Sequence, residues 1–285
     1  MKDRVQIVRT YKDTLFRFVF KDKEKLLKLY NALNGTDYTN PDDLETYTLE
    51  NAIYMGVKND VSFLLDSELS LYEQQSTFNP NMPLRDLVYI TKQLEKYIVW
   101  NTLYSSKLVR IPVPRFVVFY NGTQDQPERA VLKLSDAFEK KVEDPELELK
   151  VTMLNINLGH NKELLERCRP LRDYCTFVAR VREKAESMPI EEAVDCAVTE
   201  CIQEDILVDI LMEQRAEVMA MSVLEYNVEI EREKVRRAER EVGYEEGYGE
   251  GYDEGREAGR KAGLEAGHAE GRAKGRAEGK AEGKS

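Results

Sequence analysis

The chain has 285 residues, of which 42% are hydrophobic and 33% charged, so it can bury a core of one large domain or two modest ones and is not wholly disordered. The formal net charge is −11, yet residues 1–180 carry 26 basic and 26 acidic side chains, so charge neither favours nor excludes a nucleic-acid partner. No apolar run has transmembrane length and no signal-peptide segment opens the chain, so we expect a cytoplasmic protein without membrane association.

The first 75 residues combine a helical segment with β-prone runs. Apolar side chains recur at helical spacing over residues 11–33, and Asn34-Gly35 is a pair that ends helices. This pattern predicts one helix with Asp13 near its start. Three short β-prone runs follow, at residues 46–57, 61–66 and 69–75.

Helix and strand continue to alternate up to about residue 160, which predicts an α/β domain over residues 1–160. The further elements that we expect are a helix from Pro83 to about Ser105, a buried strand at 113–122, a short helix near 134–140 and a strand at 147–156.

Residues 161–242 are predicted to be helical throughout, with breaks at Pro170 and Pro189. This acidic helical region carries most of the negative charge, since residues 181–242 hold 8 basic and 17 acidic side chains. The four cysteines form no CxxC pair and lie in this helical sequence, which indicates buried or unreactive thiols rather than a disulfide or metal site.

Residues 243–285 form a glycine-repeat tail, in which glycine recurs at every fourth position from Gly243 to Gly283. Each glycine in a helix costs about 1 kcal/mol relative to alanine, so eleven cost roughly 10 kcal/mol. Two interpretations remain open: a solvated, disordered tail, or a helix that forms on self-association and lets two backbones approach closely.

A carboxylate and two carboxamides end the β-prone run at 69–75. Glu73 and Gln75 share one face of that strand because side chains alternate. If Ser67 and Glu68 formed the hairpin turn, Asp60 would lie opposite Gln75 and on the same face. A slip of one residue would send Asp60 to the other face.

Two carboxylates at close range favour a divalent cation, and oxygen ligands suit Mg²⁺ or Mn²⁺. Only two histidines are present, so a zinc site or a histidine-based triad would be hard to build. Gln75 would orient water, and Arg85 in the next helix would clamp a phosphate oxygen. The alternatives from the residues alone are an ordinary polar strand end and, for Arg85, a structural ion pair at the strand–helix junction.

Four segments in order resemble the Rpn family of recombination-promoting nucleases, also called YhgA-like transposases. They are DTLFRFVF (13–20), NDVSFLL (59–65), EQQSTFNPNMPLRDLVYI (73–90) and IPVPRFVVFYNG (111–122). The resemblance covers residues 10–160 and implies a restriction-endonuclease-like αβββαβ core of the PD-(D/E)XK superfamily. It also implies Mg²⁺-dependent DNA endonuclease activity.

The resemblance also assigns roles to individual residues. Asp60, Glu73 and Gln75 would be the catalytic residues, with Asp60 and Glu73 as metal ligands and Gln75 in the position of the usual lysine. A neutral amide cannot stabilise an anion as lysine does, so slow or regulated cleavage is expected. Asp13 would add a metal contact through water; its alternative is an acid that complements the helix dipole.

Arg85 and Tyr89 match the arginine and tyrosine of the family's helix and would bind substrate, although an aromatic side chain at helical spacing is also typical of a core. We therefore expect a DNA-binding endonuclease, with Mg²⁺ as cofactor and Mn²⁺ as a substitute. A homodimer through the C-terminal helices would supply the two sites that double-strand cleavage needs. The alternative function is a silenced nuclease-like domain that acts in regulation or oligomerisation.

Overall fold

The computed structural model describes residues 15–46, 60–98 and 102–213, together with short stretches between 215 and 264. The chain divides into two compact units, Met1–Glu229 and Ile230–Ser285. The predicted strand at 46–57 lies almost wholly outside the described residues, and so does Asp13.

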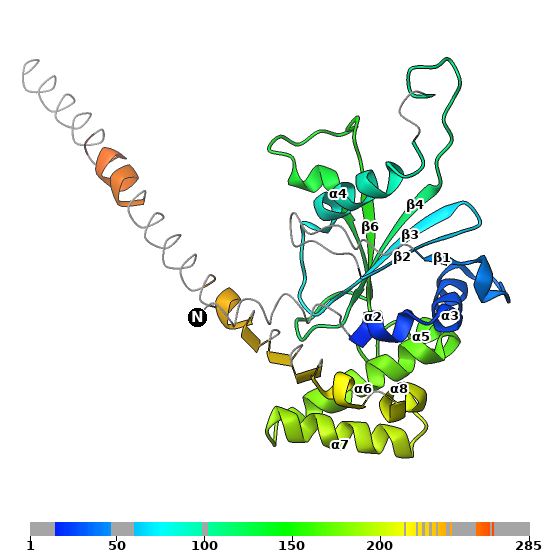
Figure 1. Cartoon of the computed structure of the whole chain (residues 1–285). Helices are drawn as coiled ribbons and strands as arrows, with labels where there is room; N and C mark the ends of the chain where they lie inside the picture. Colours follow the sequence, from blue (N-terminus) through cyan, green and yellow to red (C-terminus); the bar gives the residue numbers. More distant parts are fainter. Residues whose placement is uncertain are drawn as a thin grey trace, which may run out of the picture. The chain divides into compact units, whose positions relative to one another are not determined.

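The first unit is a mixed α/β structure built on one six-stranded sheet, with the strand order β1-β2-β3-β4-β6-β5 (Figure 1). β2 and β3 form an antiparallel hairpin, while β3, β4 and β6 run parallel to one another. β1 and β5 are antiparallel to their neighbours at the two edges. The strands are β1 (Glu45–Thr46), β2 (Val61–Leu65), β3 (Glu68–Gln75), β4 (Val113–Tyr120), β5 (Arg129–Lys133) and β6 (Lys150–Asn155).

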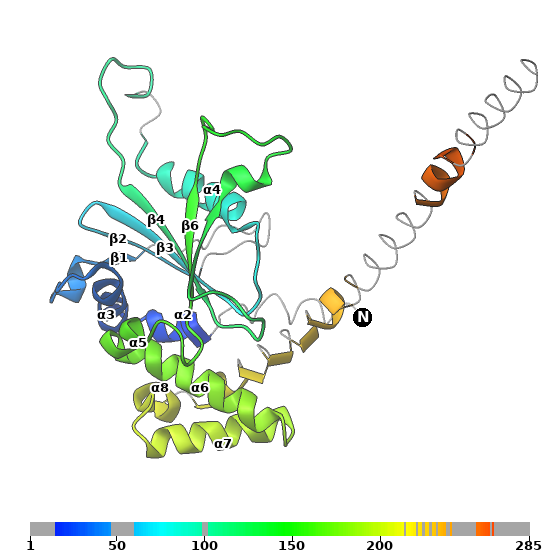
Figure 2. The same cartoon turned by 180° about the vertical axis from the view of Figure 1, so that it is seen from behind.

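Helices cover both faces of this sheet. α4 lies on one face together with the 3₁₀ turn Leu134–Ala137, and the other labelled helices lie on the opposite face, as the views from the two sides agree (Figures 1 and 2). The described helices are α2 (Leu15–Phe20), α3 (Lys23–Asn34), α4 (Met82–Leu94), α5 (Lys162–Arg167), α6 (Arg169–Ala185), α7 (Ile190–Gln203) and α8 (Val208–Glu213), with 3₁₀ turns at Pro41–Asp43 and Leu134–Ala137. None of these described helices is long and apolar enough to cross a bilayer.

The face opposite α4, which we call the helical face, buries a core rich in aromatic rings. Phe119 of β4 contacts Phe16 of α2 at a centroid distance of 5.2 Å and Tyr72 of β3 at 5.5 Å. Helices α5 to α8 add their apolar side chains to the same cluster. The described helices after residue 160 therefore belong to the first unit: α5 and α6 contact α3, and α7 packs on α6.

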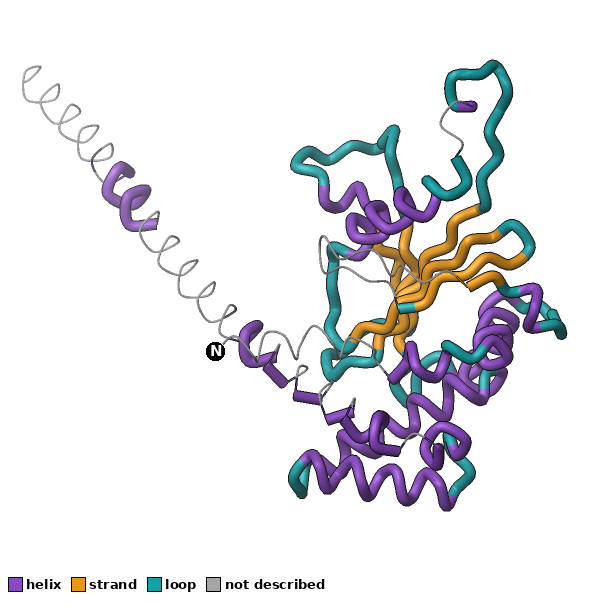
Figure 3. The backbone as a smooth tube through the Cα atoms, viewed as in Figure 1, coloured by secondary structure: helices purple, strands orange, loops and turns teal. Residues whose placement is uncertain are grey.

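The structure corrects several predicted boundaries. The helix expected over 11–33 is broken after Phe20, because Asp22 adopts an extended conformation and caps α3 through its carboxylate. The helix expected to reach Ser105 ends at Leu94. The helix expected near 134–140 is a 3₁₀ turn, and edge strand β5 was not predicted (Figure 3).

In the second unit, residues 255–262 of the glycine-repeat tail are helical. A Cβ added at Gly255 or Gly259 meets no atom within 4 Å. Glycine is therefore not required by packing at these two positions. Both interpretations of the glycine-repeat tail remain predictions.

Candidate active site

The β2–β3 hairpin sets the position of the candidate residues. Its turn is Asp66-Ser67, both with positive φ (47° and 62°), and Leu65 pairs with Glu68. The predicted turn, Ser67-Glu68, is therefore wrong by one residue. Continued past Val61 and Tyr72, the observed pairing places Asp60 opposite Glu73 rather than Gln75. The partner shifts by two residues, so Asp60 keeps its face and still shares it with Glu73 and Gln75.

The carboxyl ends of β3 and β4 are held together next to Gln75. The backbone N–H of Asn121 donates to the carbonyl oxygen of Gln75 at 2.9 Å. A Cβ added at Gly122 would come 2.1 Å from the carbonyl oxygen of Ser76 and 2.6 Å from the Tyr120 hydroxyl. Only glycine allows this approach, so Gly122 fixes the strand end that carries Glu73 and Gln75.

Glu73 is the central side chain of the site and is only 2% exposed. Its carboxylate lies 3.2 Å from the Arg85 guanidinium of α4. The carboxamide nitrogen of Gln75 donates to the same carboxylate at 3.1 Å. Strand β3 and helix α4 thus present a carboxylate, a carboxamide and a guanidinium to one another.

The environment of Glu73 disfavours its charge. Burial raises the pKa of this carboxyl to about 8, the Arg85 guanidinium opposes that rise, and the carboxylates of Asp60 and Asp86 add to it. A buried acid with a nearby cation and two nearby acids is an arrangement found often at functional sites. A second cation close to Glu73 would favour its ionised form.

Asp60 lies at the open end of the hairpin, directly before β2. Its carboxylate accepts a hydrogen bond from the backbone N–H of Gln74 at 2.7 Å. This contact ties the residue before β2 to the end of β3 and holds the Asp60 carboxylate beside the strand that carries Glu73. Asp60 and Glu73 therefore meet at one end of the hairpin, although they are 13 positions apart.

Arg85 and Tyr89 are engaged with the site from α4. The Arg85 guanidinium donates to the Tyr89 hydroxyl at 3.2 Å and lies 5.9 Å from the centre of the Tyr89 ring. Tyr89 is 1% exposed and packs with the apolar residues beneath α4. In this structure Arg85 makes the ion pair that was the alternative to phosphate binding, and Tyr89 positions it. Their roles in binding substrate stay predictions.

Asp86 is a buried carboxylate that the sequence analysis did not single out. It is 2% exposed, its Oδ1 has no hydrogen-bond partner among the described residues, and burial raises its pKa to about 7. Helical spacing offered a signal, because Asp86 lies four residues from both Met82 and Ile90, which are buried. It faces the sheet, where its charge acts on Glu73.

A divalent cation fits the donor set only as a sparsely coordinated ion. Within the described ranges, no group of three or more His, Cys, Asp or Glu side chains is arranged to hold a metal. Mg²⁺ needs only one or two protein carboxylates, because water and substrate oxygens complete its shell. Asp60 and Glu73 supply two carboxylates, and the side-chain carboxamide of Gln75 supplies a third oxygen. The raised pKa of Glu73 shows that added positive charge would be favourable next to it.

Comparisons of the chain with models of protein families, with curated proteins and with solved structures found no match. The resemblance to the Rpn family therefore rests on the four sequence segments alone. It stays a prediction, as do the roles that it assigns to individual residues.

Proposed function

We propose that the chain is a metal-dependent DNA endonuclease that hydrolyses phosphodiester bonds, with a role in recombination, mobile elements or defence. The observation that carries this proposal is the meeting of Asp60, Glu73 and Gln75 at one end of the β2–β3 hairpin, beside a guanidinium. The carboxyl ends of parallel strands are common ligand sites in α/β proteins, and Glu73 lies at such an end of β3.

Each side chain has a definite task in this proposal. Asp60 and Glu73 hold Mg²⁺, with Mn²⁺ as a substitute. The Gln75 carboxamide, fixed by its hydrogen bond to Glu73, orients the attacking water. The Arg85 guanidinium, once it leaves Glu73, neutralises a non-bridging phosphate oxygen. When bound, the cation supplies Lewis-acid stabilisation and lowers the pKa of water.

The reaction transfers the phosphoryl group to water. The water oxygen forms a bond to phosphorus and gives up one proton to the solvent, while the bond from phosphorus to the leaving oxygen of the sugar breaks and that oxygen takes up one proton from the solvent, so that one water is consumed. Glu73 has a pKa of about 8 in the absence of metal, so at neutral pH it is largely protonated until a cation or substrate arrives. This favours cleavage that rises with pH between 6 and 9.

Cleavage of supercoiled plasmid tests the proposal, with Mg²⁺, Mn²⁺ or EDTA and with the full-length chain. Wild type is compared with Asp60→Asn and Glu73→Gln, which keep the shape of each side chain. We expect metal-dependent nicking or linearisation that falls at least 100-fold, roughly the effect of losing a catalytic group, in both variants.

Asp66→Asn is the matched control, because it removes one carboxylate from the other end of the same hairpin, where asparagine tolerates the positive φ of 47°. It should cleave like wild type. Activity that persists in EDTA, or that survives both site substitutions, contradicts the proposal.

A second candidate function is a silenced nuclease-like domain that acts through regulation or oligomerisation. The observation in its favour is that Glu73 is already occupied by Arg85 and Gln75 and has a raised pKa, so the site is closed to metal as long as Arg85 stays. Arg85→Gln separates the two functions. Slower cleavage by Arg85→Gln supports Arg85 as a phosphate ligand of an active nuclease, and faster cleavage would show instead that Arg85 inhibits it. No cleavage by folded wild type or variant with any metal supports a silent domain.

We also propose that the working form is a homodimer assembled through the C-terminal helices and the glycine-repeat tail. Cleavage of both strands of a duplex normally requires two active sites, and the described part of the chain offers one such site. Light scattering of the full chain tests this: a dimer mass that changes to a monomer mass when residues 243–285 are removed supports the proposal, and a monomeric full chain contradicts it.

A further inference from the structure

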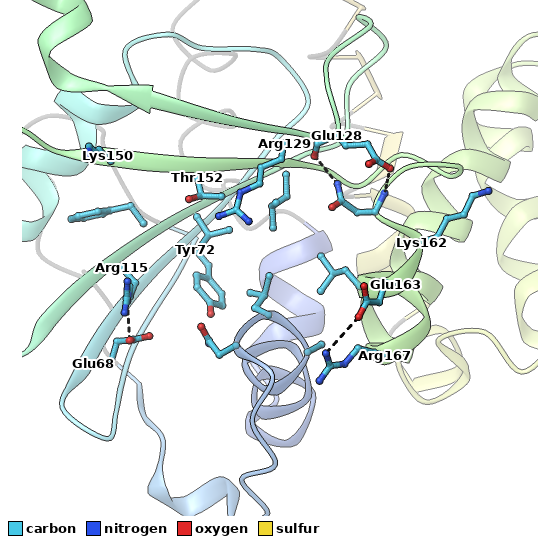
Figure 4. A pocket seen from close by; sticks show the side chains of 18 of the residues that line it. Glu68, Tyr72, Arg115, Glu128, Arg129, Lys150, Thr152, Lys162, Glu163 and Arg167 are labelled. Atoms are coloured by element: carbon cyan, nitrogen blue, oxygen red, sulfur yellow. Dashed lines mark hydrogen bonds and ion pairs between the residues drawn. The ribbon is translucent and has the colours of Figure 1, made fainter.

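A cavity opens on the helical face of the sheet, on the opposite side from Glu73. It has a volume of about 790 Å³ and lies between strands β3 to β6 and helices α3 and α5 (Figure 4). Tyr72 lines it, whereas its neighbour Glu73 points to the α4 face. The cavity is therefore separate from the candidate active site.

Basic side chains outnumber acidic ones around this cavity. Five cations line it, against three carboxylates: Arg115, Arg129, Lys150, Lys162 and Arg167 against Glu68, Glu128 and Glu163. Two of the cations are already paired, Arg115 with Glu68 at 2.8 Å and Arg167 with Glu163 at 3.9 Å.

The other three cations have no such partner. Within the described part of the chain, the side chains of Arg129, Lys150 and Lys162 make no ion pair or hydrogen bond that would neutralise them. The Glu128 carboxylate, which is next to Arg129 in the sequence, accepts from the backbone N–H of Asn161 at 3.0 Å. Three unpaired cations and one carboxylate without a cation, Glu128, therefore line the cavity, which has a net positive charge.

The strand register places two of these cations on the same wall of the cavity. β5 pairs antiparallel with β6, and Arg129 and Lys150 lie on the same face of the sheet, at opposite ends of that pairing. Thr152 lies between them on β6 and adds a hydroxyl. Figure 4 shows the Arg129 guanidinium beside Thr152, directed into the cavity, with Lys150 at one side.

The cavity also has an apolar wall. Leu33 of α3, Val117 of β4 and Leu164 of α5 line it. Cavities of 300–1,000 Å³ with a few convergent polar groups are typical of small-molecule sites. An occupant with a multiply charged end for the cations and a flat or apolar body for this wall would fit both features.

We propose that this cavity binds a phosphorylated small molecule of nucleotide size, such as a nucleoside di- or triphosphate. Arg129 is the principal phosphate ligand, because its planar guanidinium can hold two phosphate oxygens at once. Lys150 and Lys162 add point charges. The apolar wall contacts the base. The site is independent of metal binding at Glu73.

Isothermal titration calorimetry of the full chain in EDTA tests the proposal, with a nucleoside triphosphate, inorganic pyrophosphate and the unphosphorylated nucleoside as probes. We expect the triphosphate to bind in the micromolar to low millimolar range, about tenfold or more tighter than pyrophosphate, and the nucleoside alone to bind weakest. Arg129→Gln should weaken the triphosphate about tenfold or more, and Lys150→Gln should weaken it less.

Lys133→Gln is the matched control. Lys133 lies on the same strand as Arg129 and pairs with Lys150 in the register, but it does not line the cavity, so binding should change by less than about threefold. Glu73→Gln should bind like wild type, which separates this site from the candidate active site. Equal weakening by Arg129→Gln and Lys133→Gln would overturn the proposal, since it would show non-specific charge. Absence of triphosphate binding to folded wild type at millimolar concentration, or pyrophosphate binding as tightly as the triphosphate, would also overturn it.

Discussion

The two faces of the sheet are stabilised in different ways. On the helical face, aromatic and aliphatic side chains contact one another: Phe16, Phe119 and Tyr72 form a chain of ring contacts. On the α4 face, an apolar cluster of similar kind also buries charge, because Glu73 and Asp86 are each 2% exposed. The buried part of the helical face is mainly apolar, whereas the α4 face combines an apolar core with two deeply buried ionisable groups that burial destabilises.

That difference indicates where function lies. A buried carboxylate without full compensation costs free energy, and a purely structural layer gains nothing from it. On the helical face the carboxylates next to the core, Glu68 and Asp173, are paired with exposed arginines and are less deeply buried than Glu73 and Asp86. Proteins keep buried, poorly compensated charges chiefly at functional sites. We therefore place the catalytic chemistry on the α4 face.

The largest effect on stability is expected on the helical face. Phe119→Ala removes a ring that is 0% exposed and in contact with Phe16 and Tyr72. The loss should be about 3–5 kcal/mol of unfolding free energy, because a cavity remains. Urea unfolding of the full chain measures it. Val131→Ala, at a position 48% exposed on β5, is the control and should change stability by less than about 1 kcal/mol.

On the α4 face, neutralising a charge should raise stability. Glu73 has a pKa of about 8 in the fold and an ordinary value of 4.5. Between these values the unfolded chain has lost the proton that the folded chain keeps, so the unfolding free energy of wild type falls as pH rises. Above pH 8 both states are ionised and the cost stays constant. Glu73→Gln removes it and should gain on the order of 2–4 kcal/mol at pH 8.5 in EDTA.

The same experiment has an internal control. At pH 4.5 the gain from Glu73→Gln should fall to about 0.4 kcal/mol, because the folded side chain is protonated and the unfolded one is half protonated. Mg²⁺ should stabilise wild type at pH 8.5 and leave Glu73→Gln unchanged. A variant that is less stable than wild type at high pH would show that the ion pair with Arg85 outweighs the burial of Glu73.

A smaller gain is expected for Asp86→Asn. The pKa of Asp86 is raised from 3.8 to about 7, so its cost grows between these pH values and is complete near pH 8. The gain should be on the order of 1–3 kcal/mol, less than for Glu73, because one polar atom of the new amide stays without a partner in place of Oδ1. Thermal unfolding at pH 5 and pH 8 measures it, and a gain that is the same at both would contradict the assigned cause.

The sequence predicted the faces of the hairpin better than its turn. Moving the turn by one residue, from Ser67-Glu68 to Asp66-Ser67, shifts each cross-strand partner by two positions and so keeps every side chain on its face. The pattern therefore placed Asp60, Glu73 and Gln75 together without fixing which of them are opposite. Only the backbone conformation, with two consecutive positive φ values, determines the pairing.

The hydrophobic pattern of the sequence did not predict three other features: strand β5, the burial of Asp86 and the break after Phe20. β5 alternates as expected of a strand, but its outward residues include the exposed Val131, so its short pattern is weak. Asp86 follows the charged Arg85, so its helical spacing from Met82 and Ile90 was a weak signal, and the packing of α4 on the sheet shows that it is buried. The break after Phe20 depends on one side chain between two lysines, Asp22, which no periodicity detects.

The smallest effect on stability is expected at this break between α2 and α3, on the helical face. The Asp22 carboxylate accepts hydrogen bonds from the backbone N–H groups of Glu24 at 2.8 Å and Lys25 at 3.0 Å, which begins α3 at Lys23. Asp22→Ala leaves both donors without this cap and should cost about 1 kcal/mol of unfolding free energy. Asp22→Asn keeps the accepting oxygen but not the charge, so it should lose only a few tenths of that. Urea unfolding at pH 7 compares the two. Equal losses would show that the ion pair of Asp22 with Lys25, at 3.6 Å, and not the cap, separates the two helices.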